Sequence, residues 1–159
     1  SVLHIGDLGY LNVREMLAYS PKTPGQPCTA GDVLFSKINP RIPRAIVVPR
    51  AGFALTCSSE FEVMRPKPGY DAYEILLLLL AERTQKQIQS LTSGTSSSHN
   101  RIKTDQFLGI SLAIPKKGTA KRQEYDKAIK AFKEANEALN ESNMTMLTSW
   151  QTVNNLVVG

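Results

Sequence analysis

The chain has 159 residues, of which 42% are hydrophobic and 21% are charged; these ordinary proportions exclude an intrinsically disordered chain and a membrane-embedded one. Its longest uninterrupted apolar run, 75–81, is far shorter than the ~20 residues that a membrane-spanning helix needs. The formal net charge of +5 favours an acidic partner, of which nucleic acid is the commonest.

The first part of the chain predicts loops and then strands. Residues 1–31 carry three prolines and two glycines in their second half, so we expect a short segment followed by irregular backbone. Runs rich in β-branched and aromatic residues follow, separated by proline and glycine, and they predict successive strands over 32–38, 44–48 and 53–64.

A long helix is predicted over 72–91. Asp71 precedes it and Glu74 follows three residues later, which is the arrangement of a capping box, and 74–89 contains neither proline nor glycine. The small polar residues of 93–98 then predict a loop. The apolar segment 107–114, which precedes a proline, predicts a further strand.

A second long helix is predicted over 119–141, which has no proline or glycine and is rich in Ala, Lys and Glu. Its charges balance in sign, so that surface is a solvated helix face and not a DNA footprint. The tail after it has apolar residues at near-helical spacing, and it either folds back on the helix or meets another chain. Apolar residues spaced alternately three and four apart form the narrow seam of a coiled-coil-like partner interface: Tyr125, Ala128, Phe132, Ala135 and Leu139.

Signatures of catalysis are missing from the sequence. It has no glycine-rich cofactor turn, no Asn/Asp-Pro-Pro-aromatic methyltransferase site, no Glu-x-Lys nuclease pattern and no P-loop. Cys28 and Cys57 are isolated, so we expect buried, reduced thiols and no metal site. We therefore expect a non-enzymatic chain without a cofactor of its own, and a small nuclease or methyltransferase ranks last among the alternatives.

The N-terminus lacks a basic region followed by a secretory apolar stretch, so a cytoplasmic location is expected. Basic residues gather in one stretch that has only two opposing carboxylates, Glu60 and Glu62. That stretch is the expected electrostatic footprint, and a generally basic surface is the alternative. Its cationic members are Lys37, Arg41, Arg44, Arg50, Arg65 and Lys67.

Several short segments, in their order along the chain, resemble the specificity subunits of type I restriction-modification systems. In that family a Gly-Asp-hydrophobic strand leads to a Ser-Lys turn, as 31–42 does here, and the pattern continues over 45–48 and 58–66. The glycine-led loop 94–102 and the segment 107–115, which ends in Ile-Pro, are similar to the family's next features. One departure follows, because the chain has Lys-Lys-Gly-Thr where the family often carries Pro-x-x-Glu-Gln.

The resemblance implies an α+β fold with a mixed-sheet DNA target-recognition domain at 1–116 and a coiled-coil-like helical spacer and dimerisation region at 117–159. It implies sequence-specific recognition of double-stranded DNA. It further implies that the spacer pairs with another spacer and docks separate methyltransferase subunits, which bind S-adenosylmethionine and methylate adenine, and that a further subunit cleaves DNA.

Three alternatives stay open for the chain as a whole. It is a half-subunit that forms a homodimer, a fragment of a two-domain subunit, or the recognition end of a fused DNA methyltransferase. From another class of function, a protein-assembly adaptor acting through the long helix is the alternative, with the basic surface incidental.

The residues expected to contact DNA are cationic or small and polar, and they come from strand ends, turns and the polar loop. Such side chains reach phosphates, and arginine also binds guanine with two hydrogen bonds. For each of them the alternative is an exposed charge, a surface ion pair or part of a linker. They are Lys37, Asn39, Arg41, Arg44, Arg50, Ser97, Ser98, His99, Asn100, Arg101 and Lys103.

Overall fold

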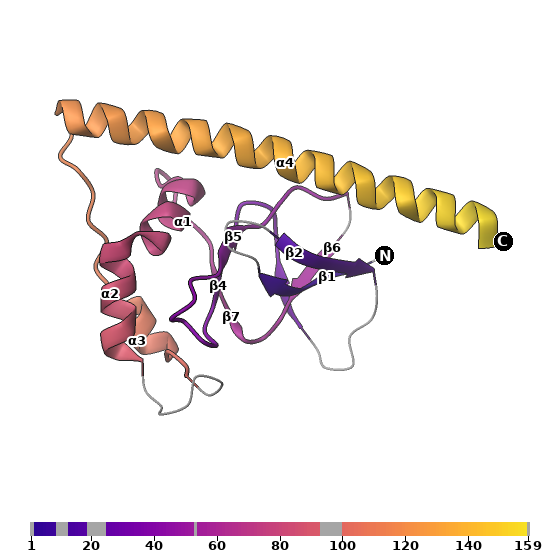
Figure 1. The fold of residues 1–159 in the computed structure, drawn as a ribbon, viewed down its shortest axis with the longest axis horizontal. Coiled ribbons are helices and arrows are strands. Elements are labelled where there is room, and N and C mark those ends of the chain that lie inside the picture. Colours follow the sequence, from indigo (N-terminus) through magenta and orange to yellow (C-terminus); the bar gives the residue numbers. More distant parts are fainter. Residues whose placement is uncertain (1, 9–12, 19–24, 53, 93–99, 159) are drawn as a thin grey trace.

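The fold is α+β, as expected: two small sheets, short helices beside them and one long C-terminal helix (Figure 1). The computed structural model describes residues 2–8, 13–18, 25–52, 54–92 and 100–158. The first sheet is mixed, because β1 runs parallel to β6 while the other neighbours are antiparallel. Its strand order is β2 (Val13–Ala18), β1 (Val2–Leu8), β6 (Ala54–Cys57) and β3 (Gln26–Cys28).

The second sheet is antiparallel and lies between the first sheet and the helices. Its order is β5 (Ala45–Val47), β4 (Val33–Ser36) and β7 (Phe61–Met64). Val33 and Phe35 of the central strand point into a core shared with the helices, whereas Leu34 points into a core shared with the first sheet. A strand covered on both faces has to be apolar throughout, which explains the unbroken Val-Leu-Phe run.

The helix predicted over 72–91 is two helices, α1 (Ala72–Leu80) and α2 (Glu82–Leu91). Asp71 caps α1 as expected, since its carboxylate accepts a hydrogen bond from the Tyr73 backbone at 2.7 Å. At Ala81 the backbone is extended, with φ −66° and ψ 145°. Side chains replace the missing helical bonds there: the Thr84 hydroxyl donates to the Leu78 carbonyl and the Gln85 amide to that of Leu79.

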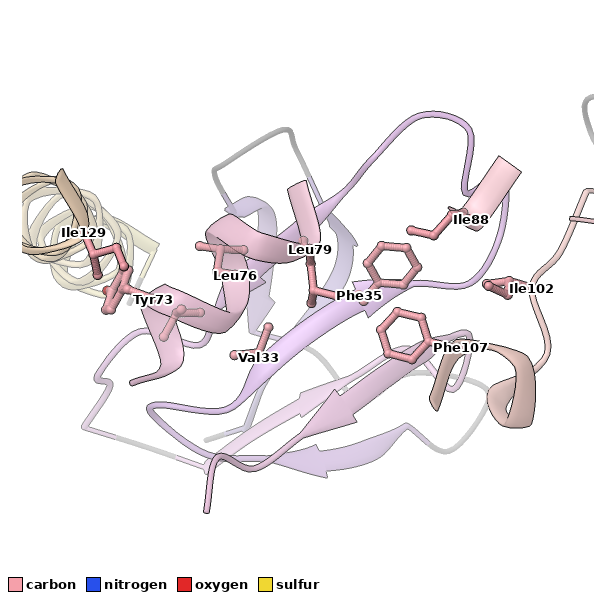
Figure 2. Close-up of a cluster of buried hydrophobic side chains, with 11 residues drawn as sticks. Val33, Phe35, Tyr73, Leu76, Leu79, Ile88, Ile102, Phe107 and Ile129 are labelled. Atoms are coloured by element: carbon pink, nitrogen blue, oxygen red, sulfur yellow. The ribbon is translucent and has the colours of Figure 1, made fainter. Parts of the chain in front are cut away.

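Three further expectations about local structure are wrong. The run 53–64, expected to be one strand, contains β6 and β7, which belong to different sheets. The region expected to be irregular contains β1, β2 and β3, and Pro27 fits β3 because that strand is at the edge of its sheet. The segment 107–114 was expected to be a strand. Its first two residues instead end the short helix α3 (Thr104–Leu108), and the rest has no regular structure. Phe107 of α3 fills the core beside Phe35, as Figure 2 shows, so the apolar run is used to cover the core and not to pair with a strand.

The second long helix is confirmed and extends to the end of the described chain as α4 (Ala120–Val158). Its 39 residues form a rod of about 58 Å, so the tail continues the helix and does not fold back. Figure 1 shows α4 lying across α1 and then past the first sheet. Ile129 is buried in the helix-side core, and Met144 and Leu147 pack on the other core. Within the described ranges, no helix is both long and apolar enough to cross a membrane.

Candidate nucleic-acid interface

Two segments far apart in the sequence meet at one end of the second sheet: the β4–β5 hairpin, residues 37–44, and the segment 100–103. Ile38 and Arg101 form an antiparallel bridge. The backbone N–H of Asn39 donates to the backbone carbonyl of Asn100 at 2.8 Å, and the backbone N–H of Ile102 donates to the backbone carbonyl of Lys37 at 3.2 Å. We call this surface, residues 37–44 and 100–103, the hairpin end; it contains seven of the eleven residues expected to contact DNA.

Arg44 braces the hairpin from within. Its guanidinium donates to the Ile38 carbonyl at 2.8 Å and to the Ser36 hydroxyl at 3.2 Å. Hydrogen bonds from a charged donor are stronger than neutral ones, so this contact fixes the path of the loop. Arg44 therefore positions the hairpin end, and its side chain is already engaged by the protein.

The tip of the hairpin is a tight turn. The Ile42 amide donates to the Asn39 carbonyl at 3.0 Å, and Pro40 occupies the position of the turn where its fixed φ is favoured. Asn39 has φ 54°, the left-handed conformation that asparagine tolerates better than most residues. Asn39 and the buried Asn100 thus shape this surface through their backbones.

Of the five basic residues of the hairpin end, Arg41 and Lys103 are exposed and form no ion pair with the other residues that the structure describes. Lys37 and Arg101 form ion pairs. Lys37 lies 3.9 Å from the Glu62 carboxylate, and Arg101 pairs with Glu60 on the protein surface. An exposed ion pair of this kind contributes little free energy, so Arg101 can exchange Glu60 for another anion at small cost.

The remaining expected contacts fall elsewhere. Arg50 follows β5 and lies at the opposite end of the second sheet, because Val47 pairs with Val33 while Ala45 pairs with Phe35. Arg65 is also at that opposite end, where it pairs with the buried Asp32 at 3.2 Å. The structure does not bring Arg50 to the hairpin end. Ser97, Ser98 and His99 lie outside the described residues.

The predicted partner seam of α4 is only partly covered by the domain. Tyr125 and Phe132 are half-buried and pack against the protein's own core. Ala128, Ala135 and Leu139 are exposed, on the adjoining side of the helix that the domain leaves uncovered, here called the outward face. The residues that bury α4 on the domain include Ile129, Asn136, Met144 and Leu147, which the seam missed. Tyr125, Ile129, Phe132 and Asn136 follow one another at intervals of four, three and four residues, so the core-facing stripe shares two positions with the predicted seam, and Ile129 was its apolar signal in the sequence.

The outward face of α4 becomes more apolar towards the C-terminus. Residues 142–158 contain no Asp, Glu, Lys or Arg. Met146 and Trp150 are each 63% exposed and Val153 is 58% exposed. With Leu139, Met146 and Val153 repeat every seven residues, which is the period of a helix that packs along a second helix.

A groove of about 300 Å³ lies between α1 and α4. Across it Lys133 pairs with Asp71 at 3.6 Å. Burial, and then the neighbouring Glu74 carboxylate, raises the pKa of Tyr125 to about 12, so its phenol is neutral at pH 7. The groove is lined by Asp71, Glu74, Asp126, Ile129, Lys130 and Lys133.

Both cysteines are free and buried, on the neighbouring strands β3 and β6. A hydrogen bond between the two thiols lowers the pKa of Cys28, and the same bond together with burial raises the pKa of Cys57. They lie in the core beside Ile5 and Leu55. In the part of the chain that the structure describes, no group of His, Cys, Asp or Glu is arranged to hold a metal ion.

No protein-family model matches the chain, and no curated protein sequence matches it.

Proposed function

We propose that this chain recognises double-stranded DNA by sequence, as the specificity half-subunit of a type I restriction-modification complex. The observation that carries the proposal is the meeting of the 37–44 hairpin with residues 100–103. These segments belong to two separate parts of the family resemblance, and together they make one braced, cationic surface. In this role the chain is non-catalytic and directs separate adenine methyltransferase and restriction subunits to the DNA site.

Affinity at the hairpin end rests on phosphate contacts from Arg41, Arg101 and Lys103. Each phosphate neutralised makes the logarithm of the binding constant fall by ~0.9 for each unit of log salt concentration. Three such contacts give a slope of about −3, which a binding assay resolves easily. Base-edge contacts from the same turn supply the choice of sequence.

In the same proposal α4 is the spacer. The core-facing stripe holds it against the recognition domain, and the outward face of its C-terminal half pairs with the equivalent helix of another chain in a coiled-coil-like contact. The methyltransferase subunits dock on the paired spacers and bring the S-adenosylmethionine that they bind. The chain determines where the complex binds on DNA, and its partners catalyse the reactions there.

The test is selection of bound sequences from a randomised duplex pool at two salt concentrations, with the mass of the protein monitored. We expect a short enriched motif that is retained less well at high salt. Arg41→Glu with Lys103→Glu abolishes this retention. The matched control is Lys121→Glu with Lys127→Glu, which changes the net charge equally on exposed positions of α4.

Two results contradict the proposal. One is the absence of retained DNA at low salt, both for the chain alone and with an added methyltransferase subunit. The other is an equal loss of binding in both charge-reversed pairs, because binding then follows net charge and the hairpin end is not the interface.

A second candidate function is a protein-assembly adaptor that acts through α4. The observation that favours it is the uncharged, outward-facing stretch with Met146, Trp150 and Val153 exposed. An adaptor binds its partner at high salt and retains no DNA, whereas the specificity subunit assembles and also retains DNA in a salt-dependent way. The same two-salt experiment therefore separates the two functions.

A further inference from the structure

The tip of the hairpin carries an aliphatic side chain in a cationic setting. Ile42 is 59% exposed, although Pro40 of the same turn is buried. Arg41 precedes it in the turn, and Arg101 and Lys103 belong to the adjoining segment. A single exposed apolar residue is ordinary on a protein surface. The surroundings of Ile42, and the way it is held, are what distinguish it.

Two prolines and several hydrogen bonds restrain the backbone around Ile42. Prolines at 40 and 43 fix their own φ angles and restrict the residues before them. The turn is closed by the bond from the Ile42 amide to the Asn39 carbonyl, and the Asn39 amide is tied to the Asn100 carbonyl. Arg44 closes the base of the loop through the Ile38 carbonyl. The turn is therefore preorganised and presents Ile42 at its surface.

A rigid apolar tip beside cations matches one known way of engaging a duplex. Proteins that bend DNA insert an Ile, Leu, Met, Phe or Pro side chain between base pairs, and flanking Arg and Lys residues hold the backbone. The inserted side chain leaves water, while the cost of unstacking is lowest at flexible pyrimidine–purine steps. An exposed isoleucine on a braced turn has the shape and the chemistry for this role.

We propose that Ile42 inserts between two adjacent base pairs of the bound duplex, where it unstacks and kinks them, while Arg41, Arg101 and Lys103 hold the nearby phosphates. This inference rests on the proposed function, since it requires DNA at the hairpin end. It adds a means of sequence choice by deformability: the favoured target has a pyrimidine–purine step at the point of insertion.

The experiment uses the full chain and duplexes carrying 2-aminopurine at successive positions of the selected motif, with end-to-end energy transfer to report bending. We expect the wild type to raise 2-aminopurine fluorescence at one step and to shorten the end-to-end distance. Ile42→Ser abolishes both signals and weakens binding about ten- to hundredfold, the value of burying a side chain of this size. Ile42→Leu keeps the fluorescence change, the bending and the affinity of the wild type.

The matched control is Ile114→Ser, which removes an exposed isoleucine of the segment before α4. It leaves both the fluorescence and the affinity unchanged. Salt-dependent binding by the wild type without unstacking at any position overturns the insertion and leaves DNA recognition standing. An Ile42→Ser protein that still unstacks the step also overturns it. Failure of the wild type to bind any duplex at low salt overturns the insertion together with the proposed function.

Discussion

Phe107 stacks on Phe35, with ring centroids 4.7 Å apart and ring planes inclined by 27°. Phe35 belongs to β4, which leads into the hairpin, and Phe107 belongs to α3, which follows residues 100–103. Both rings are buried, and Ile102 and Ile88 lie close to them in the same core (Figure 2). The stacked pair therefore holds the two halves of the hairpin end in register from inside the protein.

Removal of the Phe107 ring should lower stability and weaken DNA binding together. A buried Phe→Ala change costs about 3–5 kcal/mol in unfolding free energy, through lost burial and the cavity left behind. Urea unfolding followed by circular dichroism measures it. Leu108→Ala is the matched control, since Leu108 is 68% exposed and its loss should change stability by less than about 0.5 kcal/mol. Equal effects of the two substitutions would show that Phe107 does not hold the core.

Arg44→Lys tests the brace of the hairpin at constant charge. Lysine cannot reproduce the two guanidinium bonds to Ile38 and Ser36, and bonds of this charged type are worth about 1.5–3 kcal/mol each. We expect faster hydrogen exchange at the Asn39 amide, which bonds to the Asn100 carbonyl, and weaker DNA binding. Arg41→Lys keeps the exchange rate of that amide unchanged. If the backbone amide of Asn39 exchanges its hydrogen equally slowly in both variants, Arg44 does not brace the hairpin.

The central strands and both helix starts were predictable, because they depend on local signals. The first three residues of β4 are apolar, Asp71 is a strong capping residue, and the residues of α4 favour a helix. The strands before residue 29 were not predictable in the same way. β1 and β3 pair with β6, which lies far along the chain, and β2 pairs with β1, while the nearby prolines and glycines give the opposite local signal.

The candidate site shows the same limit. Lys37, Arg41 and Arg101 were identified by charge and position alone, and the structure brings them to one surface. Two other predicted contact residues differ from these three in ways that the sequence does not reveal. Arg44 turns inward and braces the hairpin, and Arg50 lies at the opposite end of the second sheet. For α4, periodicity revealed a seam but not which stripe the domain itself covers, since two apolar stripes lie next to each other on that helix.

Ionisation of Tyr73 makes the free energy of unfolding depend on pH in the alkaline range. Burial, and then the carboxylates of Glu137 and Asp71, raises its pKa to about 12, from the ordinary value of about 10. A raised pKa means that the folded state holds the proton more tightly, so this contribution is complete below pH 10 and is lost as pH rises towards 12. We expect the urea midpoint to fall over that range. In Tyr73→Phe the fall is smaller, and an identical pH profile for both proteins would contradict the assignment.

The two faces of α4 predict opposite results for two double substitutions. Tyr125→Asp with Phe132→Asp places charges against the protein's own core, so it should lower the unfolding free energy by several kcal/mol, about 2–3 for each buried charge after partial solvation. Met146→Glu with Val153→Glu places charges on the exposed outward face, and it should leave the urea midpoint nearly unchanged while lowering the oligomer mass in light scattering. The matched control is Thr145→Glu with Thr152→Glu, which adds equal charge to the exposed positions one residue earlier, on another side of the helix. If both glutamate pairs leave an oligomer of the same mass, the outward face is not the contact between chains, and the spacer role proposed for α4 fails at that step.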